Sequence, residues 1–119
     1  MKRILVGDDS PTITTLLQTT LEGNGYEVAT ARNGLETYEM GVNAEFDLAI
    51  VDYLMPGLLG LEVIDRWRAE GVDMPVIVLT GVDDERTAIE SLNRTSVDFV
   101  RKPFRVHELL ARIRQRIPD

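Results

Sequence analysis

Apolar residues along this chain gather in five short runs, and the stretches between them carry apolar residues at helical spacing. The runs cover residues 4–7, 26–31, 46–52, 75–80 and 97–101. Two of them contain four apolar residues in succession, Leu48–Val51 and Val76–Leu79, which predicts strands buried on both faces. Five strands alternating with helices predict an α/β fold of three layers, a doubly wound parallel sheet with helices on both sides.

The predicted helices have recognisable start signals. Ser10 precedes Pro11, a good N-cap followed by a residue suited to the first helical position. Asn33 opens a second helix with the acidic Glu36 three residues later. Five helices are predicted. The first runs from Ser10 to a stop at residues 23–25, the second covers 33–43 and the third 59–70, the fourth begins at Asp83, and the fifth covers 106–117.

Composition limits the class of protein. A length of 119 residues predicts a single domain, 1–119, with no output domain. No apolar run approaches the roughly 20 residues of a membrane span, and the segment after Met1 is too short for a signal peptide. The absence of cysteine fits a reducing cytoplasm.

The charge of the chain argues against contact with nucleic acid. A net charge of −7 repels phosphates, so we expect no direct DNA or RNA binding by this domain. The arginines and lysine between residues 101 and 116 form a locally basic stretch. We interpret that stretch as a solvated helix face whose cations suit a helix C-terminus.

Polar side chains follow four of the five predicted strands. They are Asp8, Asp9, Asp52, Thr80 and Lys102. Parallel strands deliver their carboxyl ends to one edge of a sheet. If the strand order is 2-1-3-4-5, the first and third strands meet where the winding reverses, and ligands bind in the crevice at such a point. Each residue alone has an ordinary structural explanation, but together they predict one pocket.

Three clustered carboxylates require a cation, because two like charges ~4 Å apart repel by about 4 kcal/mol at an effective dielectric near 20. Hard oxygen ligands that are few and open to water suit Mg²⁺, for which Mn²⁺ could substitute. Mg²⁺ beside a lysine and a threonine is the equipment of phosphoryl transfer, in which an aspartate can be the nucleophile. Asp52, at the end of a central strand, is the candidate nucleophile.

Several short motifs occur in order along almost the whole chain. They are Ile4–Asp9, Asp52–Gly57 with Gly60, Val78–Gly81 and Asp98–Phe104. Through these motifs the chain resembles the receiver domains of two-component response regulators, and their order and spacing are specific in combination. The resemblance implies a flavodoxin-like fold, with five parallel strands in the order 2-1-3-4-5 and five helices.

The same resemblance implies roles for the acidic residues. Asp52 would accept a phosphoryl group from the phosphohistidine of a sensor histidine kinase or a phosphotransfer protein. Asp9 would bind Mg²⁺ directly, Asp8 would bind it largely through water, and the backbone carbonyl of Leu54 would be a further ligand. The domain would be a regulatory phosphoacceptor with slow self-dephosphorylation, and not an enzyme acting on outside substrates.

The implied switch involves the remaining polar site residues and one aromatic residue. Lys102 would contact the phosphoryl group and Thr80 would hydrogen-bond to it. Phe99 would then turn inward, although plain core packing also accounts for an aromatic residue there. The Lys102–Pro103 bond is expected to be cis. Helix 4, strand 5 and helix 5 would form the face read by an effector protein or a fused output domain, and phosphorylation could drive homodimer formation.

Three other functions are weighed against the receiver. A phosphatase with an aspartyl intermediate often has a second Asp two residues after the nucleophile, where this chain has Leu54. A flavin-binding module would want a Ser/Thr/Gly-rich phosphate loop after the first strand, where residues 8–11 read Asp-Asp-Ser-Pro. A degenerate receiver that acts only as a docking module stays open as the main alternative.

The chain departs from the family pattern at a few positions. Thr95–Ser96 replaces the usual Gly-Ala step, and Leu54 and Val82 are apolar where many relatives are polar. Leu58 and Leu59 are apolar in a loop that should be exposed. They either pack under the third helix or form a docking patch for a partner. His107 is expected at the surface.

Overall fold

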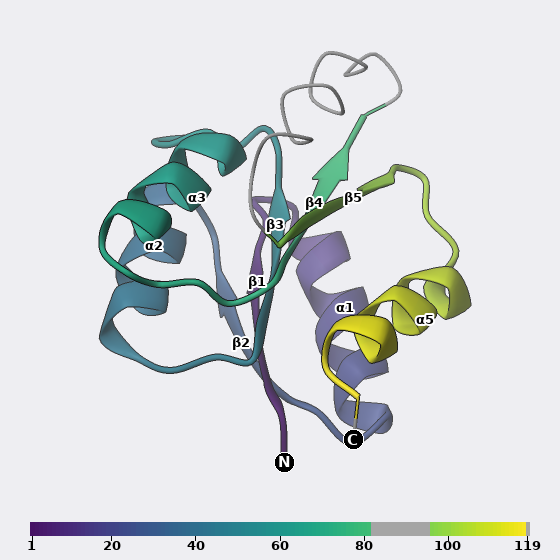
Figure 1. Cartoon of the computed structure of the whole chain (residues 1–119). Helices are drawn as coiled ribbons and strands as arrows, with labels where there is room; N and C mark the ends of the chain where they lie inside the picture. The colour runs from purple at the N-terminus through teal and green to yellow at the C-terminus, as the bar shows by residue number, and fades with distance from the viewer. Residues whose placement is uncertain (82–95, 119) are drawn as a thin grey trace.

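The computed structural model describes residues 1–81 and 96–118, which form a five-stranded sheet between two layers of helices (Figure 1). The strands are β1 Arg3–Gly7, β2 Glu27–Ala31, β3 Leu48–Asp52, β4 Val76–Thr80 and β5 Val97–Arg101. The helices are α1 Pro11–Gly23, α2 Gly34–Asn43, α3 Gly60–Ala69 and α5 Val106–Arg116. The helix predicted from Asp83 lies outside the described residues, as do Val82 and Thr95.

The strand order is β2-β1-β3-β4-β5 and every pairing is parallel, which confirms the predicted topology. Leu5 of β1 is in register with Ala29 of β2 on one side and with Ala49 of β3 on the other. The winding of the chain therefore reverses between β1 and β3. Asp8 and Asp52 follow or end these two strands, so they meet at the reversal.

Side chains alternate between two cores, one on each face of the sheet. Ile4 and Val6 of β1 pack into a core with α1 and α5, whereas Leu5 packs into a core with α3 on the opposite face. In Figure 1, α1 and α5 lie on one side of the sheet and α2 and α3 lie on the other. Burial on both faces explains why β3 and β4 are continuously apolar up to the polar residue that ends each of them.

The predicted helix starts are confirmed by their capping bonds. The Ser10 hydroxyl accepts a hydrogen bond from the Ile13 N–H at 3.4 Å, and the Asn33 side chain accepts one from the Glu36 N–H at 2.8 Å. No helix in the described part of the chain is long and apolar enough to cross a membrane.

The third strand is shorter than predicted, because Phe46 and Asp47 are held by Arg3 before the strand begins. The Arg3 guanidinium lies 4.8 Å from the centre of the Phe46 ring. The Arg3 N–H donates to the Asp47 carboxylate at 2.7 Å. Regular pairing of β3 with β1 starts only at Leu48.

The seam between α2 and α3 depends on a glycine. Trp67 is fully buried, and its indole N–H donates to the Tyr38 carbonyl of α2 at 3.0 Å. A Cβ atom added to Gly41 would lie 2.5 Å from the Trp67 ring, closer than such atoms can approach. The two helices can therefore pack this closely only with glycine at position 41.

Gly41→Ala is expected to destabilise the fold by about 1–3 kcal/mol, because the added methyl group overpacks against Trp67. Gly23→Ala is the control. It meets no atom within 4 Å at the end of α1 and should stabilise the fold by about 0.5–1 kcal/mol. Urea unfolding followed by circular dichroism measures both changes, and equal midpoints for the two variants would contradict this account of the seam.

Candidate functional site

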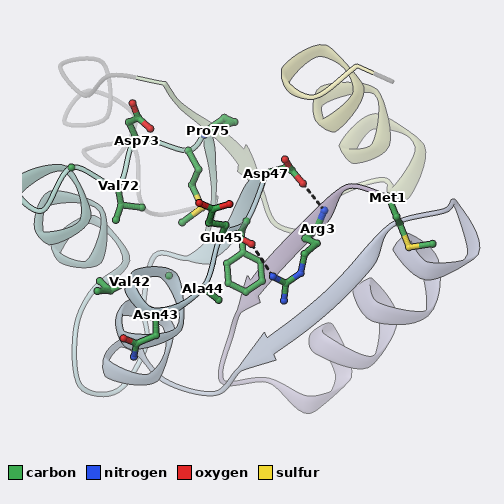
Figure 2. A pocket seen from close by; sticks show the side chains of 14 residues that line it. Met1, Arg3, Val42, Asn43, Ala44, Glu45, Asp47, Val72, Asp73 and Pro75 are labelled. Carbon is green, nitrogen blue, oxygen red and sulfur yellow. Dashed lines mark hydrogen bonds between the residues drawn. The ribbon is translucent and has the colours of Figure 1, made fainter.

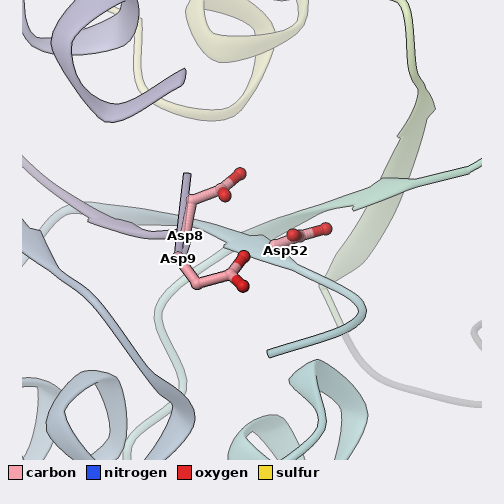
Figure 3. A group of neighbouring side chains, drawn as sticks. All are labelled: Asp8, Asp9 and Asp52. Atoms are coloured by element: carbon pink, nitrogen blue, oxygen red, sulfur yellow. The ribbon is translucent and has the colours of Figure 1, made fainter. Parts of the chain in front are cut away.

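The polar residues that follow the strands meet at the carboxyl edge of the sheet. Asp8, Asp52 and Thr80 are buried, with 1%, 8% and 3% of their surface exposed, whereas Asp9 is exposed. Each of the three aspartates offers one oxygen atom, and these three oxygens lie within 4.8 Å of one another (Figure 3). The acidic pocket expected from the sequence is present.

Asp8 is fixed by the backbone on both sides. Its N–H donates to the Ala31 carbonyl of β2 at 3.1 Å. One of its carboxylate oxygens accepts a hydrogen bond from the Ser10 N–H at 2.9 Å, directly before α1. Its other oxygen lies 3.3 Å from the Lys102 ammonium. The start of α1 and the shape of the pocket therefore depend on the same carboxylate.

Lys102 bridges the two buried aspartates. Its ammonium nitrogen lies 3.2 Å from an Asp52 oxygen and 3.3 Å from an Asp8 oxygen. The Lys102 N–H donates to the Thr80 carbonyl, and the bond to Pro103 is cis, as expected. Burial alone would lower the pKa of the Lys102 ammonium, but the charges of Asp52 and Asp8 outweigh burial and raise it. Lys102 is therefore charged in the pocket.

One ammonium does not balance the pocket. Burial, followed by the charge of Asp8, raises the pKa of the Asp52 carboxyl, although Lys102 opposes that change. The ionised form of Asp52 is thus disfavoured despite its lysine neighbour. A second cation among three carboxylates would relieve this repulsion. Hard oxygen donors with one exposed member, Asp9, fit Mg²⁺, so the residues present suit the predicted metal.

The loop after Asp52 folds back against it. The Gly60 N–H donates to the Tyr53 carbonyl at 2.9 Å, which closes the loop, and Gly57 turns the chain there with a positive φ of 90°. A Cβ atom at Gly60 would lie 2.5 Å from the Asp52 carbonyl oxygen. Gly60 thus lets α3 start directly behind the acidic residue. Leu54 lies in this loop and is exposed.

The two residues predicted to switch lie on neighbouring strands. Thr80 ends β4 inside the site, while Phe99 on β5 pairs in register with Val78 and is partly buried against the core that includes α3. The structure brings Thr80 to the pocket edge, whereas Phe99 lies two residues before Arg101, the β5 residue in register with Thr80. The packing of Phe99 agrees with the plain core interpretation, and its movement stays a prediction.

One expectation for the basic stretch was too simple. Arg112 was predicted to be part of a solvated face, yet its guanidinium binds both carboxylate oxygens of Asp98, at 2.9 and 3.0 Å. This ion pair connects α5 to β5. It could not be predicted from a local sequence pattern, because the two partners are 14 residues apart in the chain. His107 is exposed, as predicted.

A hollow of about 880 Å³ lies at the opposite edge of the sheet and contains none of the predicted site residues. Arg3, Glu45 and Asp73 are among its lining residues (Figure 2). Arg3 is already engaged there, since its guanidinium donates to the Glu45 carbonyl at 3.0 Å. Among the described residues, the acidic cluster of Asp8, Asp9 and Asp52 lies at the carboxyl edge instead.

Comparison with known proteins identifies similar sequences. A family model described as the response regulator receiver domain matches residues 4–114. Response regulator MprA of Mycobacterium sp. (strain KMS) is 39% identical over 112 residues, which cover 94% of this chain and 49% of that protein. The protein of the same name from Mycobacterium leprae is 40% identical over the same shares. The chain thus spans about half the length of these relatives.

Solved structures agree in fold. The receiver domain of Francisella response regulator 1452 has a TM-score of 0.90 at 30% identity, covering 98% of this chain and 96% of that one. Response regulator protein TrrA from Thermotoga maritima, in complex with Mg²⁺ and BeF, has a TM-score of 0.87 at 38% identity, covering 98% and 100%. The flavodoxin-like arrangement is shared by all three chains.

Asp52→Asn is expected to raise the free energy of unfolding at pH 7 in EDTA, because it removes a charge that the pocket disfavours. The pKa of Asp52 is higher in the fold than in the unfolded chain, where it is about 3.9. Ionisation therefore destabilises the fold as pH rises above about 4, and the gain should vanish as pH falls to that value.

Urea midpoints between pH 4 and pH 7 measure this gain, with the exposed Asp73→Asn as control. Excess Mg²⁺ should reduce the gain of Asp52→Asn, since a bound cation would favour the ionised form. A variant that is less stable than the wild type at pH 7 would contradict the electrostatic interpretation.

Proposed function

The chain belongs to the response regulator receiver domain family, and we propose that it is a phosphorylation-dependent signalling switch with Asp52 as phosphoacceptor. The observation that carries the proposal is the position of the Lys102 ammonium, 3.2 Å from Asp52 and 3.3 Å from Asp8. A cation held against the candidate nucleophile is suited to receive phosphoryl oxygens as they arrive.

Asp8, Asp9, Asp52 and the Leu54 backbone carbonyl would hold Mg²⁺, for which Mn²⁺ could substitute. The bound ion would supply positive charge to the oxygens of the incoming phosphoryl group. The three clustered carboxylates and the raised pKa of Asp52 support this assignment. The Thermotoga relative is described in complex with Mg²⁺ and BeF, which is consistent with it.

In the proposed reaction a carboxylate oxygen of Asp52 attacks the phosphorus of a phosphohistidine. An O–P bond forms, the P–N bond to the imidazole breaks, and its electron pair stays on that nitrogen. Asp52 must be ionised to attack, and the ammonium of Lys102 favours that form. The product is an aspartyl phosphate on this chain, so the domain is a regulatory phosphoacceptor that returns slowly to its resting state by hydrolysis.

The phosphoryl group would then drive the switch. Its oxygens accept hydrogen bonds from the Lys102 ammonium and the Thr80 hydroxyl, and Phe99 turns inward beside them. Going from mostly off to mostly on requires about 5.5 kcal/mol of differential stabilisation, which a few charge-assisted bonds can supply. The face read by partners would include β5 and α5, together with the predicted fourth helix.

The proposed partners follow from this chemistry. The donor would be a sensor histidine kinase or a phosphotransfer protein, and the receiver of the signal an effector protein or a fused output domain. We further propose that residues 1–119 act as one receiver unit in the cytoplasm, with no direct contact to nucleic acid or membrane. Homodimer formation could accompany phosphorylation.

Incubation with acetyl phosphate and Mg²⁺ is expected to add one phosphoryl group to the chain, detected by intact mass. The gain should disappear in Asp52→Asn and in EDTA, because each removes one of the groups the transfer needs. Asp73→Asn, an exposed aspartate at the opposite edge, is the control and should be modified as the wild type is. An unmodified wild-type chain that also forms no beryllofluoride adduct would favour the docking module.

Thr80→Ala is expected to keep phosphorylation at Asp52 and to weaken the apparent affinity for beryllofluoride about tenfold. One lost hydrogen bond to a charged group amounts to about 1.5–3 kcal/mol. Titration monitored by ¹⁵N–¹H correlation spectra measures the affinity and reports the amide shifts of β5. Thr15→Ala, exposed on α1, is the control, and equal affinities of the two variants would remove Thr80 from the switch.

A further inference from the structure

Exposed leucines gather at the end of the molecule that carries Asp52. Leu35, Leu54 and Leu59 have 49%, 55% and 39% of their surface exposed. Leu54 and Leu59 lie in the loop between β3 and α3, and Leu35 is in the first turn of α2. We name these three residues the leucine patch.

Backbone contacts hold the leucine patch together. Leu54 and Leu59 adjoin the two residues whose hydrogen bond closes the loop, the Gly60 N–H donating to the Tyr53 carbonyl at 2.9 Å. The start of α2 is attached to the same loop, because the Gly34 N–H donates to the Pro56 carbonyl at 2.9 Å. Leu58, in contrast, packs partly buried against the core, so the loop keeps one leucine inside and exposes its neighbour.

Local helix chemistry does not explain leucine at these positions. Leu59 is the N-cap of α3 and makes no side-chain capping bond, although Ser, Thr, Asp and Asn are strongly preferred there. Leu35 is in the first turn of α2, where an acidic residue would suit the helix dipole. Both leucines give up stabilisation that a polar residue would provide, which is typical of positions that serve a function.

The acidic pocket has a second apolar flank. A groove of about 420 Å³ beside Lys102 is lined by Ile13, Leu16, Pro103 and Phe104. A donor as small as acetyl phosphate needs to touch only the pocket between these surfaces. A protein that brings a phosphohistidine to Asp52 has to cover the rim, and would bury apolar surface there.

We propose that the leucine patch docks the protein phosphodonor, against an apolar strip beside its phosphohistidine. This inference rests on the proposed function, since it assigns a partner to the same site. Covering the patch excludes water from the mouth of the pocket and strengthens the attraction between Lys102 and the phosphoryl oxygens. Because the patch carries no charge, its contribution to docking depends little on salt.

The test is the double variant Leu35→Ser, Leu59→Ser. Serine suits the N-cap of α3 and is tolerated in the first turn of α2, so the variant should fold. Leu54 is left unchanged because its carbonyl is a proposed metal ligand. The sensor histidine kinases encoded in the same genome as this chain are first screened as autophosphorylated cytoplasmic cores. The kinase that phosphorylates the wild type fastest is then used as the donor. A tenfold or larger loss of kcat/KM for transfer is expected.

Two controls isolate docking from chemistry. Phosphorylation of the double variant by acetyl phosphate should stay within twofold of the wild type, because that donor does not reach the patch. Val42→Ser removes an apolar side chain at the opposite edge of the sheet (Figure 2), where Val42 is 39% exposed, as Leu59 is. This variant should accept the phosphoryl group from the kinase as fast as the wild type.

Each other outcome counts against the inference. Unchanged transfer from the kinase, or equal slowing with both donors, would overturn the docking role while leaving Asp52 as phosphoacceptor. Transfer from none of the kinases, with acetyl phosphate still effective, would overturn it also. A wild-type chain that acetyl phosphate cannot modify would remove the proposed function, and the docking role with it.

Discussion

The structure depends on a repulsion that its own topology creates. A parallel sheet that reverses its winding between β1 and β3 brings the carboxylates of Asp8 and Asp52 to one point, where both are buried. Burial of like charges is unfavourable. The Lys102 ammonium offsets only part of this repulsion, since the pKa of Asp52 stays raised. A further cation, or a change of charge on Asp52, would therefore change the electrostatic energy of the pocket.

The supporting contacts connect this pocket to the strands and helices around it. The Asp8 carboxylate accepts a hydrogen bond from the Ser10 N–H directly before α1, and the Asp8 N–H donates to β2. The Lys102 N–H donates to the Thr80 carbonyl. A change in the charge of Asp52 therefore acts on groups already joined to β4 and β5. Gly60 adds to this rigidity, because its lack of a side chain lets α3 begin against the Asp52 carbonyl. The described pocket residues are thus joined to one another and to the neighbouring elements by hydrogen bonds and ion pairs.

Periodicity and the common direction of parallel strands were sufficient to predict a parallel sheet with the five polar residues at its carboxyl edge. The strand order that brings these residues into one pocket came from the resemblance to receiver domains. The sequence could not predict which oxygens Lys102 bridges, since that depends on how β5 is placed beside β4. The Asp98–Arg112 pair was missed for a similar reason, because it depends on how α5 packs against the sheet. The exposure of Leu59 beside a buried Leu58 follows from the path of one loop, which alternation of residue types does not fix.

Charged residues lie at both the amino and the carboxyl edge of the sheet, but they are paired differently. This difference in pairing indicates which edge carries the function. At the amino edge the Arg3 guanidinium contacts the Glu45 carbonyl and the Phe46 ring, and the Arg3 N–H donates to the Asp47 carboxylate, so the charges of Arg3 and Asp47 both have a nearby partner. At the carboxyl edge the three carboxylates of Asp8, Asp9 and Asp52 lie close together, the Lys102 ammonium pairs with two of them, and exposed leucines lie in the adjoining loop. Unbalanced charge and uncovered apolar surface both disfavour the isolated domain. The partners proposed above, a cation in the pocket and a protein across its rim, would account for the presence of both features at one edge.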